Sequence, residues 1–227
     1  MTDAKSGSTK ILFLFVAVAV AGGGVFAYQK FLSPRARATK VYISGNELLK
    51  QGKLSEAMAE YRNALKIDTN LVDARNNLAN LLLNDGKKEE AIEEYKKVIA
   101  LNPKYIAARN NMGIALASLG RLDEAIAFYQ ESLKEIPSAA DLHNSLGTLF
   151  GQEGKFDDAI KHFGEAVKLN PDNFRAKQNL EIAIREEQAF RKALEEKEKQ
   201  VEVGKKEADK PKPISEPLPE PAATPAP

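Results

Sequence analysis

A repeat of 34 residues, present four times without insertion or deletion, constrains the fold of this 227-residue chain more than any other feature. Alanine marks the period, at Ala57, Ala91, Ala125 and Ala159. The copies fall at 38–71, 72–105, 106–139 and 140–173. A period of this length predicts an array of stacked units, because one such unit cannot bury its apolar face alone.

Each copy predicts two helices joined by a tight turn. In the last copy, apolar residues recur at helical intervals over 142–150 and again over 156–167. Gly154 separates the two sets at slot 15, counting from the start of the copy, and a glycine stands at slot 15 of every copy. Glycine accepts the left-handed backbone that ends a helix. Pro171, at slot 32, cannot continue a helix interior and predicts the boundary of the copy.

The slot pattern identifies a family resemblance. Slot 20 is always alanine, slot 8 is small (Gly45, Ala79, Gly113, Gly147) and slot 24 is aromatic (Tyr61, Tyr95, Tyr129, Phe163). This pattern resembles the tetratricopeptide repeat (TPR), and the resemblance covers residues 38–173. It implies an all-α, right-handed superhelical solenoid of four helix-turn-helix hairpins. Two departures stand out: slot 4 holds Val41, Arg75, Arg109 and His143 where the family often has a large aromatic residue, and Thr69 replaces the first slot-32 proline.

Residues 174–203 predict a long C-terminal capping helix. The segment begins like a fifth copy, with Leu180 at slot 7, but Glu181 occupies the small slot and no glycine follows at slot 15. Opposite charges four residues apart, such as Glu187 and Arg191, favour a solvated helix. A stacked array needs a polar helix of this kind at its end.

The two ends of the chain differ from the repeats in composition. After a polar stretch at 1–10, residues Ile11 to Tyr28 carry no charge over 18 residues, about 27 Å of helix, which predicts a transmembrane anchor. The alternative is a cleaved signal, with 11–21 as its apolar core and 25–27 as its cleavage site. A basic linker is expected at 29–37. Seven of the eleven prolines lie in 204–227, which predicts a disordered, proline-rich tail that is either a spacer or a docking segment.

By analogy with single-span proteins that have short amino tails, we expect a bacterial inner-membrane protein with its repeats in the periplasm. The positive charges on the two sides of the segment do not decide the orientation.

Composition and side-chain chemistry argue against several function classes. The net charge of +1 excludes a strongly basic nucleic-acid footprint, so no nucleic-acid partner is expected. The chain has no cysteine, which excludes disulfides and thiol catalysis. His143 and His162 are its only histidines, and we interpret both as packed or surface residues. We therefore expect no enzyme activity, no cofactor and no metal.

The inner face of the predicted array is rich in side-chain amides. Slots 2, 5, 6, 9 and 13 of each first helix form a stripe opposite its partner helix. They place there Asn46, Asn76, Asn77, Asn80, Asn110, Asn111, Asn144, Ser145 and, in the capping helix, Asn179. A carboxamide both donates and accepts, so a row of them could bond the backbone of an extended peptide whatever its side chains. The slot-6 row also resembles the asparagine ladder in the repeat domain of O-linked N-acetylglucosamine transferases. The alternative is that asparagine is simply common before slot 7 in this repeat.

Two functions remain open at this stage. The first is a membrane-tethered adaptor that binds an extended segment of a partner protein in its asparagine-rich groove. The second is a structural scaffold that self-associates or organises a membrane-bound assembly, in which case a homo-oligomer is expected.

Overall fold

The computed structural model describes residues 33–208, and every regular element in that range is an α-helix. Eight helices form four successive pairs and a ninth follows them. The pairs are α3 (Pro34–Lys50) with α4 (Leu54–Ile67), α5 (Val72–Asn84) with α6 (Lys88–Leu101), α7 (Ile106–Ser118) with α8 (Leu122–Glu135), and α9 (Ala140–Gln152) with α10 (Phe156–Leu169). The last helix, α11, spans Phe174–Ala208.

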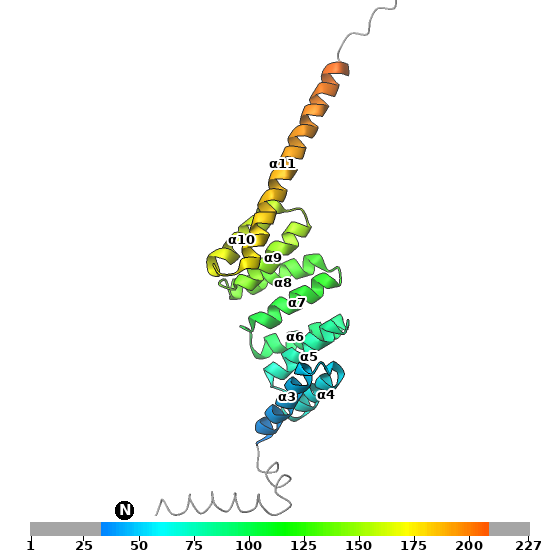
Figure 1. Ribbon diagram of the computed structural model, residues 1–227, viewed down its shortest axis with the longest axis vertical. Helices are drawn as coiled ribbons and strands as arrows, with labels where there is room; N and C mark the ends of the chain where they lie inside the picture. Colours follow the sequence, from blue (N-terminus) through cyan, green and yellow to red (C-terminus); the bar gives the residue numbers. More distant parts are fainter. Residues whose placement is uncertain (1–32, 209–227) are drawn as a thin grey trace, which may run out of the picture.

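The pairs stack one on the next along the long axis of the molecule, and α11 leaves the far end of the stack as a single projecting helix (Figure 1). The first part of α11 contacts both α9 and α10. The predicted fold class, an all-α solenoid of four hairpins followed by a long C-terminal helix, is confirmed.

The turn within each pair depends on its glycine. Gly120 has a φ of 76°, and the Gly120 N–H donates to the Ala117 carbonyl while the Arg121 N–H donates to the Leu116 carbonyl. These two bonds form a Schellman motif, which satisfies carbonyls at the end of α7. A residue with a Cβ would be strained at this φ, so the glycine is required for the chain to reverse and begin α8.

The core lies between the two helices of each pair and between neighbouring pairs. The four slot-20 alanines, Ala57, Ala91, Ala125 and Ala159, are all completely buried, and they occupy equivalent places. The slot-24 aromatic rings pack beside them and are at most 5% exposed. The small residues at slots 8 and 20 let these rings fit between closely spaced helices.

Both ends of the helical region differ from the expected segment boundaries. Four residues of the expected 29–37 linker belong to α3, because Ser33 caps the helix by accepting from the Ala36 N–H and Pro34 occupies its first turn. The last helix continues five residues beyond 203, where a Glu202–Lys206 ion pair supports it.

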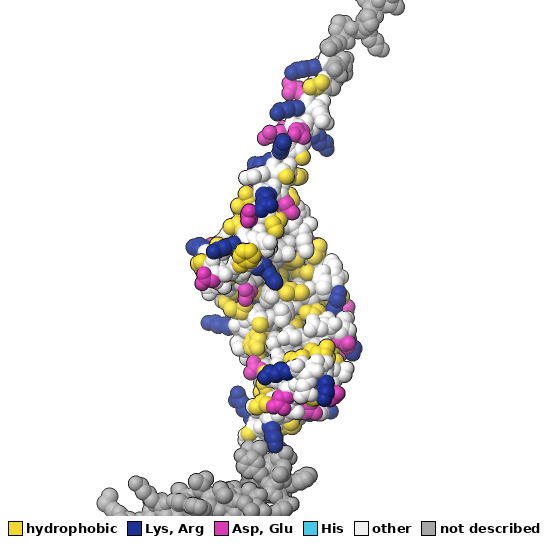
Figure 2. Space-filling view, in the orientation of Figure 1, with side chains coloured by type: hydrophobic (Ala, Val, Ile, Leu, Met, Phe, Trp, Pro, Cys, Tyr) yellow, Lys and Arg dark blue, Asp and Glu magenta, His cyan; other side chains and the backbone are white. Residues whose placement is uncertain are grey.

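The predicted anchor at 11–28 and most of the proline-rich tail lie outside the described residues. Within 33–208, no helix is long and apolar enough to cross a bilayer. Figure 2 shows basic and acidic side chains interspersed over the visible face of the molecule, including α11.

Candidate peptide-binding groove

The first helices of successive pairs build the inner face of the array. Helix α5 contacts α7, α7 contacts α9, and α9 contacts α11. Their slot 5, 6 and 9 side chains are therefore brought together across repeat boundaries. Eight of the nine predicted groove residues form four hydrogen-bonded pairs, which we call the amide ladder: Asn46–Asn77, Asn80–Asn111, Asn110–Ser145 and Asn144–Asn179.

In the first two steps of the amide ladder, a slot-9 asparagine is the acceptor. Asn77 Nδ2 donates to Asn46 Oδ1 at 3.2 Å, and Asn111 Nδ2 donates to Asn80 Oδ1 at 2.9 Å. The same oxygens also accept from the slot-24 hydroxyls of Tyr61, at 2.7 Å, and Tyr95, at 2.6 Å. Each acceptor therefore joins the two helices of its own repeat to the first helix of the next.

The last two steps use a different acceptor because slot 9 changes. Ile114 and Thr148 replace asparagine there, so the acceptor moves to slot 5. Ser145 Oγ donates to Asn110 Oδ1 at 2.6 Å, and Asn179 Nδ2 donates to Asn144 Oδ1 at 3.0 Å. The contact between neighbouring repeats is kept through a different residue.

Asn76 is the one predicted groove residue outside the amide ladder. Its side chain is 6% exposed, and its Oδ1 atom has no hydrogen-bond donor among the described residues. The slot-6 residue of the next repeat, Asn111, bonds to Asn80 instead. A buried acceptor without a donor costs about 1–3 kcal/mol.

Burial keeps the tyrosines beneath the amide ladder in their neutral, donating form. It raises the pKa of Tyr61, Tyr95 and Tyr129, and in each case this outweighs the opposing effect of a hydrogen bond with a neighbouring amide or hydroxyl group. At neutral pH these hydroxyls are fixed donors. Tyr61 and Tyr95 hold the carboxamides of Asn46 and Asn80 in one orientation, whereas Tyr129 donates to the backbone carbonyl of Asn110.

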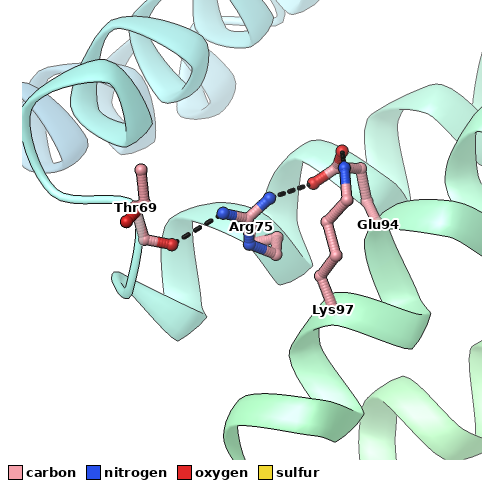
Figure 3. Close-up of polar contacts among 4 residues, drawn as sticks. All are labelled: Thr69, Arg75, Glu94 and Lys97. Carbon is pink, nitrogen blue, oxygen red and sulfur yellow. Dashed lines mark hydrogen bonds and ion pairs between the residues drawn. The ribbon is translucent and has the colours of Figure 1, made fainter.

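A second polar network replaces the aromatic residue that the family often has at slot 4. Figure 3 shows Arg75 between two partners: one guanidinium nitrogen lies 2.6 Å from the Thr69 carbonyl and another lies 2.5 Å from Glu94 Oε2. Lys97 contacts the other carboxylate oxygen of Glu94, Oε1. Arg109 repeats the arrangement with the Pro103 carbonyl and Glu135. Slot 4 thus ties the second and third repeats to the turns that precede them.

Arg109 is also the most deeply buried charge of this network. It is 4% exposed and donates to the Ser132 hydroxyl, which is completely buried, at 3.0 Å. Sequence reasoning did not find these partners. The available signal was the recurrence of a hydrogen-bonding residue at slot 4 in three successive copies.

The two histidines lie together in the fourth repeat. Both are partly buried, which agrees with their interpretation as packed or surface residues. His143, also at slot 4, has Nε2 3.1 Å from the Pro137 carbonyl, and its Nδ1 is 3.0 Å from His162 Nδ1. A carbonyl only accepts, so His143 Nε2 carries a proton and neutral His143 accepts from His162 through Nδ1. Within the described residues, no group of three His, Cys, Asp or Glu side chains could hold a metal ion.

Family models described as TPR repeat and tetratricopeptide repeat match residues 45–86, 76–140 and 140–173. The chain is a TPR protein. A search of curated proteins found no match.

Several solved structures are similar to this TPR protein. A crystal structure of MamA is 26% identical with a TM-score of 0.54, and the match covers 70% of this chain and 96% of that one. A structure titled as a functional characterization of Pseudomonas aeruginosa PilF is 26% identical with a TM-score of 0.59, covering 69% and 72% of the two chains. A second MamA structure, at 24% identity and a TM-score of 0.57, covers 79% of this chain and 98% of that one, and shows the fold alone.

Proposed function

We propose that this TPR protein is a membrane-anchored adaptor that binds an extended segment of a partner protein in its asparagine-rich groove. The observation that carries the proposal is that the slot-6 carboxamides have hydrogen-bonding atoms that the array itself does not use. Asn111 and Asn179 each use one N–H in the amide ladder, and Asn77 donates both to Asn46 and, at 3.5 Å, to the Tyr42 hydroxyl. The Oδ1 atoms of all three have no hydrogen-bond partner among the described residues, so each offers an acceptor to a peptide backbone, and Asn111 and Asn179 also offer a second N–H.

The TPR array itself supports a protein as the partner, since repeats of this kind serve as adaptors or scaffolds for protein interaction. The near-neutral charge of the chain supports a protein rather than a nucleic acid. The anchor rests on the uncharged segment Ile11 to Tyr28. A compartment-sensitive reporter fused after Pro227, with membrane fractionation, tests both the attachment and the side on which the repeats lie.

The groove is tested by measuring peptide binding to the full chain in detergent. A fluorescent library of extended peptides is titrated against the wild type and against the variant carrying Asn77→Ala and Asn111→Ala. Each lost backbone bond contributes about 0.5–1.5 kcal/mol, so the double variant should bind roughly fivefold to a hundredfold more weakly. Unchanged affinity would contradict the groove.

Two control variants separate peptide contact from damage to the array. Asn63→Ala makes the same chemical change at an exposed position of α4, a second helix of its pair, and should leave affinity unchanged. Tyr95→Phe removes the hydroxyl that donates to Asn80 of the amide ladder but keeps every carboxamide of the proposed groove. It should lower stability while most of the binding remains.

The second candidate is a scaffold that self-associates, and exposed apolar residues on α11 favour it. Phe190, Leu194 and Val201 are each between 44% and 52% exposed and recur at helical spacing. Sedimentation of the full chain in detergent, with and without Phe190→Ser and Leu194→Ser, should reveal a concentration-dependent oligomer that the substitutions weaken. A wild-type chain that stays monomeric across the concentration range would rule the scaffold out.

A further inference from the structure

Near its N-terminal end the inner face carries a carboxylate that is bonded to one tyrosine and has a second tyrosine one helical turn away. Asp73 lies in the first turn of α5 and is exposed. The hydroxyl of Tyr105, which precedes α7, donates to Asp73 Oδ1 at 3.2 Å. Tyr42 of α3 lies one helical turn further along α5: its hydroxyl is 3.5 Å from Nδ2 of Asn77, which follows Asp73 by four residues.

Within the part of the chain that the structure describes, the negative charge of Asp73 has no cationic partner. Among the ion pairs of residues 33–208, none includes Asp73. The neighbouring Arg75 is engaged with Glu94 and the Thr69 carbonyl. Burial raises the pKa of Tyr105, and the adjacent Asp73 charge raises it further, as expected beside an uncompensated carboxylate.

A second unsatisfied acceptor lies one helical turn away. Asn76 follows Asp73 by three residues, so the two share one face of α5. The Asn76 side chain is more than nine-tenths buried, and its Oδ1 lacks a donor among the described residues. The Asn76 oxygen is closed off from solvent, so Asp73 is the acceptor of this corner that a ligand can reach.

We propose that Tyr42, Asp73 and Tyr105 form a subsite for a lysine or arginine side chain of the peptide bound in the groove. The proposal rests on the proposed function and adds a side-chain preference to backbone binding. An ammonium or guanidinium group supplies several N–H donors and the opposite charge. Its aliphatic stem can pack on the tyrosine rings, whose faces also attract a cation.

The chain contains a natural control for this subsite. Asp141 occupies the equivalent slot 2 of the fourth repeat and is also exposed. The positions equivalent to Tyr42 and Tyr105 are Asn110 and Asn173 there, so Asp141 has the charge without the aromatic frame. If charge alone mattered, the two aspartates would behave alike.

The test selects decapeptides from a random display library against the full chain in detergent, as wild type, Asp73→Asn and Asp141→Asn. Wild type and Asp141→Asn should enrich peptides with a lysine or arginine at one fixed position. Asp73→Asn should still select peptides, without that preference. Replacing the basic residue of a selected peptide by leucine should weaken binding to wild type roughly fivefold to twentyfold and should change binding to Asp73→Asn less than twofold.

The outcomes distinguish the subsite from the groove. Selection of peptides with no basic preference, or a preference that survives Asp73→Asn, overturns the subsite and leaves the adaptor intact. If no peptide is selected by any folded variant, the groove fails and the subsite fails with it. Thermal unfolding of Asp73→Asn within a few degrees of wild type excludes misfolding as the cause of a lost preference.

Discussion

The Tyr129 ring lies directly over Gly113, so closely that a Cβ built at Gly113 would come within 2.2 Å of Tyr129 Cζ. The Tyr129 hydroxyl donates to the Asn110 carbonyl at 2.8 Å. The preceding repeat uses the same slots differently, because Ala79 replaces the glycine and Tyr95 donates to Asn80 Oδ1. The third repeat has Ile114 in place of that asparagine, so the hydroxyl of its tyrosine passes over the glycine and donates to the backbone carbonyl of Asn110 instead.

We predict that Gly113→Ala destabilises the protein by about 1–3 kcal/mol, since overpacking forces the ring or the helix to move. Adding Ile114→Asn copies the second repeat and provides the missing acceptor. The double variant should recover part of the lost stability. Urea unfolding of the full chain followed by circular dichroism measures both effects.

Gly164→Ala is the matched control for this substitution. Gly164 lies inside α10, and a Cβ there would meet nothing within 4 Å. Removing a helix-interior glycine should stabilise the chain by about 0.5–1 kcal/mol. If the two substitutions changed the free energy of unfolding equally, crowding against Tyr129 would not be the cause of the destabilisation by Gly113→Ala.

The repeat framework was predictable because each of its elements depends on local geometry. Gly120 could be placed from the need for a positive φ, and Ala125 from the close approach of two helices, and both expectations agree with the structure. The fold class followed from these positions and from the 34-residue period. The N-cap at Ser33 was missed because a Ser-Pro pair is compatible with either a linker or the first turn of a helix.

The pairing within the amide ladder could not be predicted. The candidate residues were placed on one face, but the partner of each depends on which atoms meet between positions 31 or 35 residues apart. The replacement of Asn by Ile114 shifts the acceptor from slot 9 to slot 5, and no periodicity in the sequence encodes that shift. Arg109 likewise reaches Ser132 and the Pro103 carbonyl through side-chain conformations that only packing decides.

The amide ladder makes a prediction about stability that is independent of any ligand. Asn80→Ala removes the acceptor shared by Tyr95 and Asn111, and we expect a loss of about 1–3 kcal/mol because partly buried donors are left unpaired. Tyr95→Phe removes one of those donors. The variant carrying both changes should therefore lose less than the sum of the single losses in urea unfolding. Strict additivity would show that the two side chains are not coupled.

The ion pair at slot 4 predicts an acid-sensitive contribution to folding. Burial alone would raise the pKa of Glu94, but hydrogen bonds and charges from Lys97 and Arg75 outweigh it and lower that pKa from its ordinary value of 4.5. The stability from Glu94 is therefore complete above pH 4.5 and is lost as the pH falls through the lower, folded-state value. Glu94→Gln should be less stable at pH 7 by about 1–3 kcal/mol.

The comparison across pH identifies the source of that loss. The difference between Glu94→Gln and wild type should shrink as the pH is lowered from 5 to 3 in thermal unfolding. A matched substitution at the exposed Glu93, Glu93→Gln, should change stability by no more than about 0.5 kcal/mol. A constant Glu94→Gln difference at every pH would contradict the ionic origin.

The histidine pair of the fourth repeat predicts a loss of stability at mildly acidic pH. Burial lowers the pKa of His162 below its ordinary value of 6.5, and the charges of His143 and Lys161 lower it further. Because the unfolded chain binds this proton more readily, stability is complete above pH 6.5 and falls as the pH drops below that value. His162→Phe should remove this pH dependence. If the thermal unfolding midpoint of the variant falls between pH 7 and 5.5 as much as that of the wild type, the proton binds to another residue.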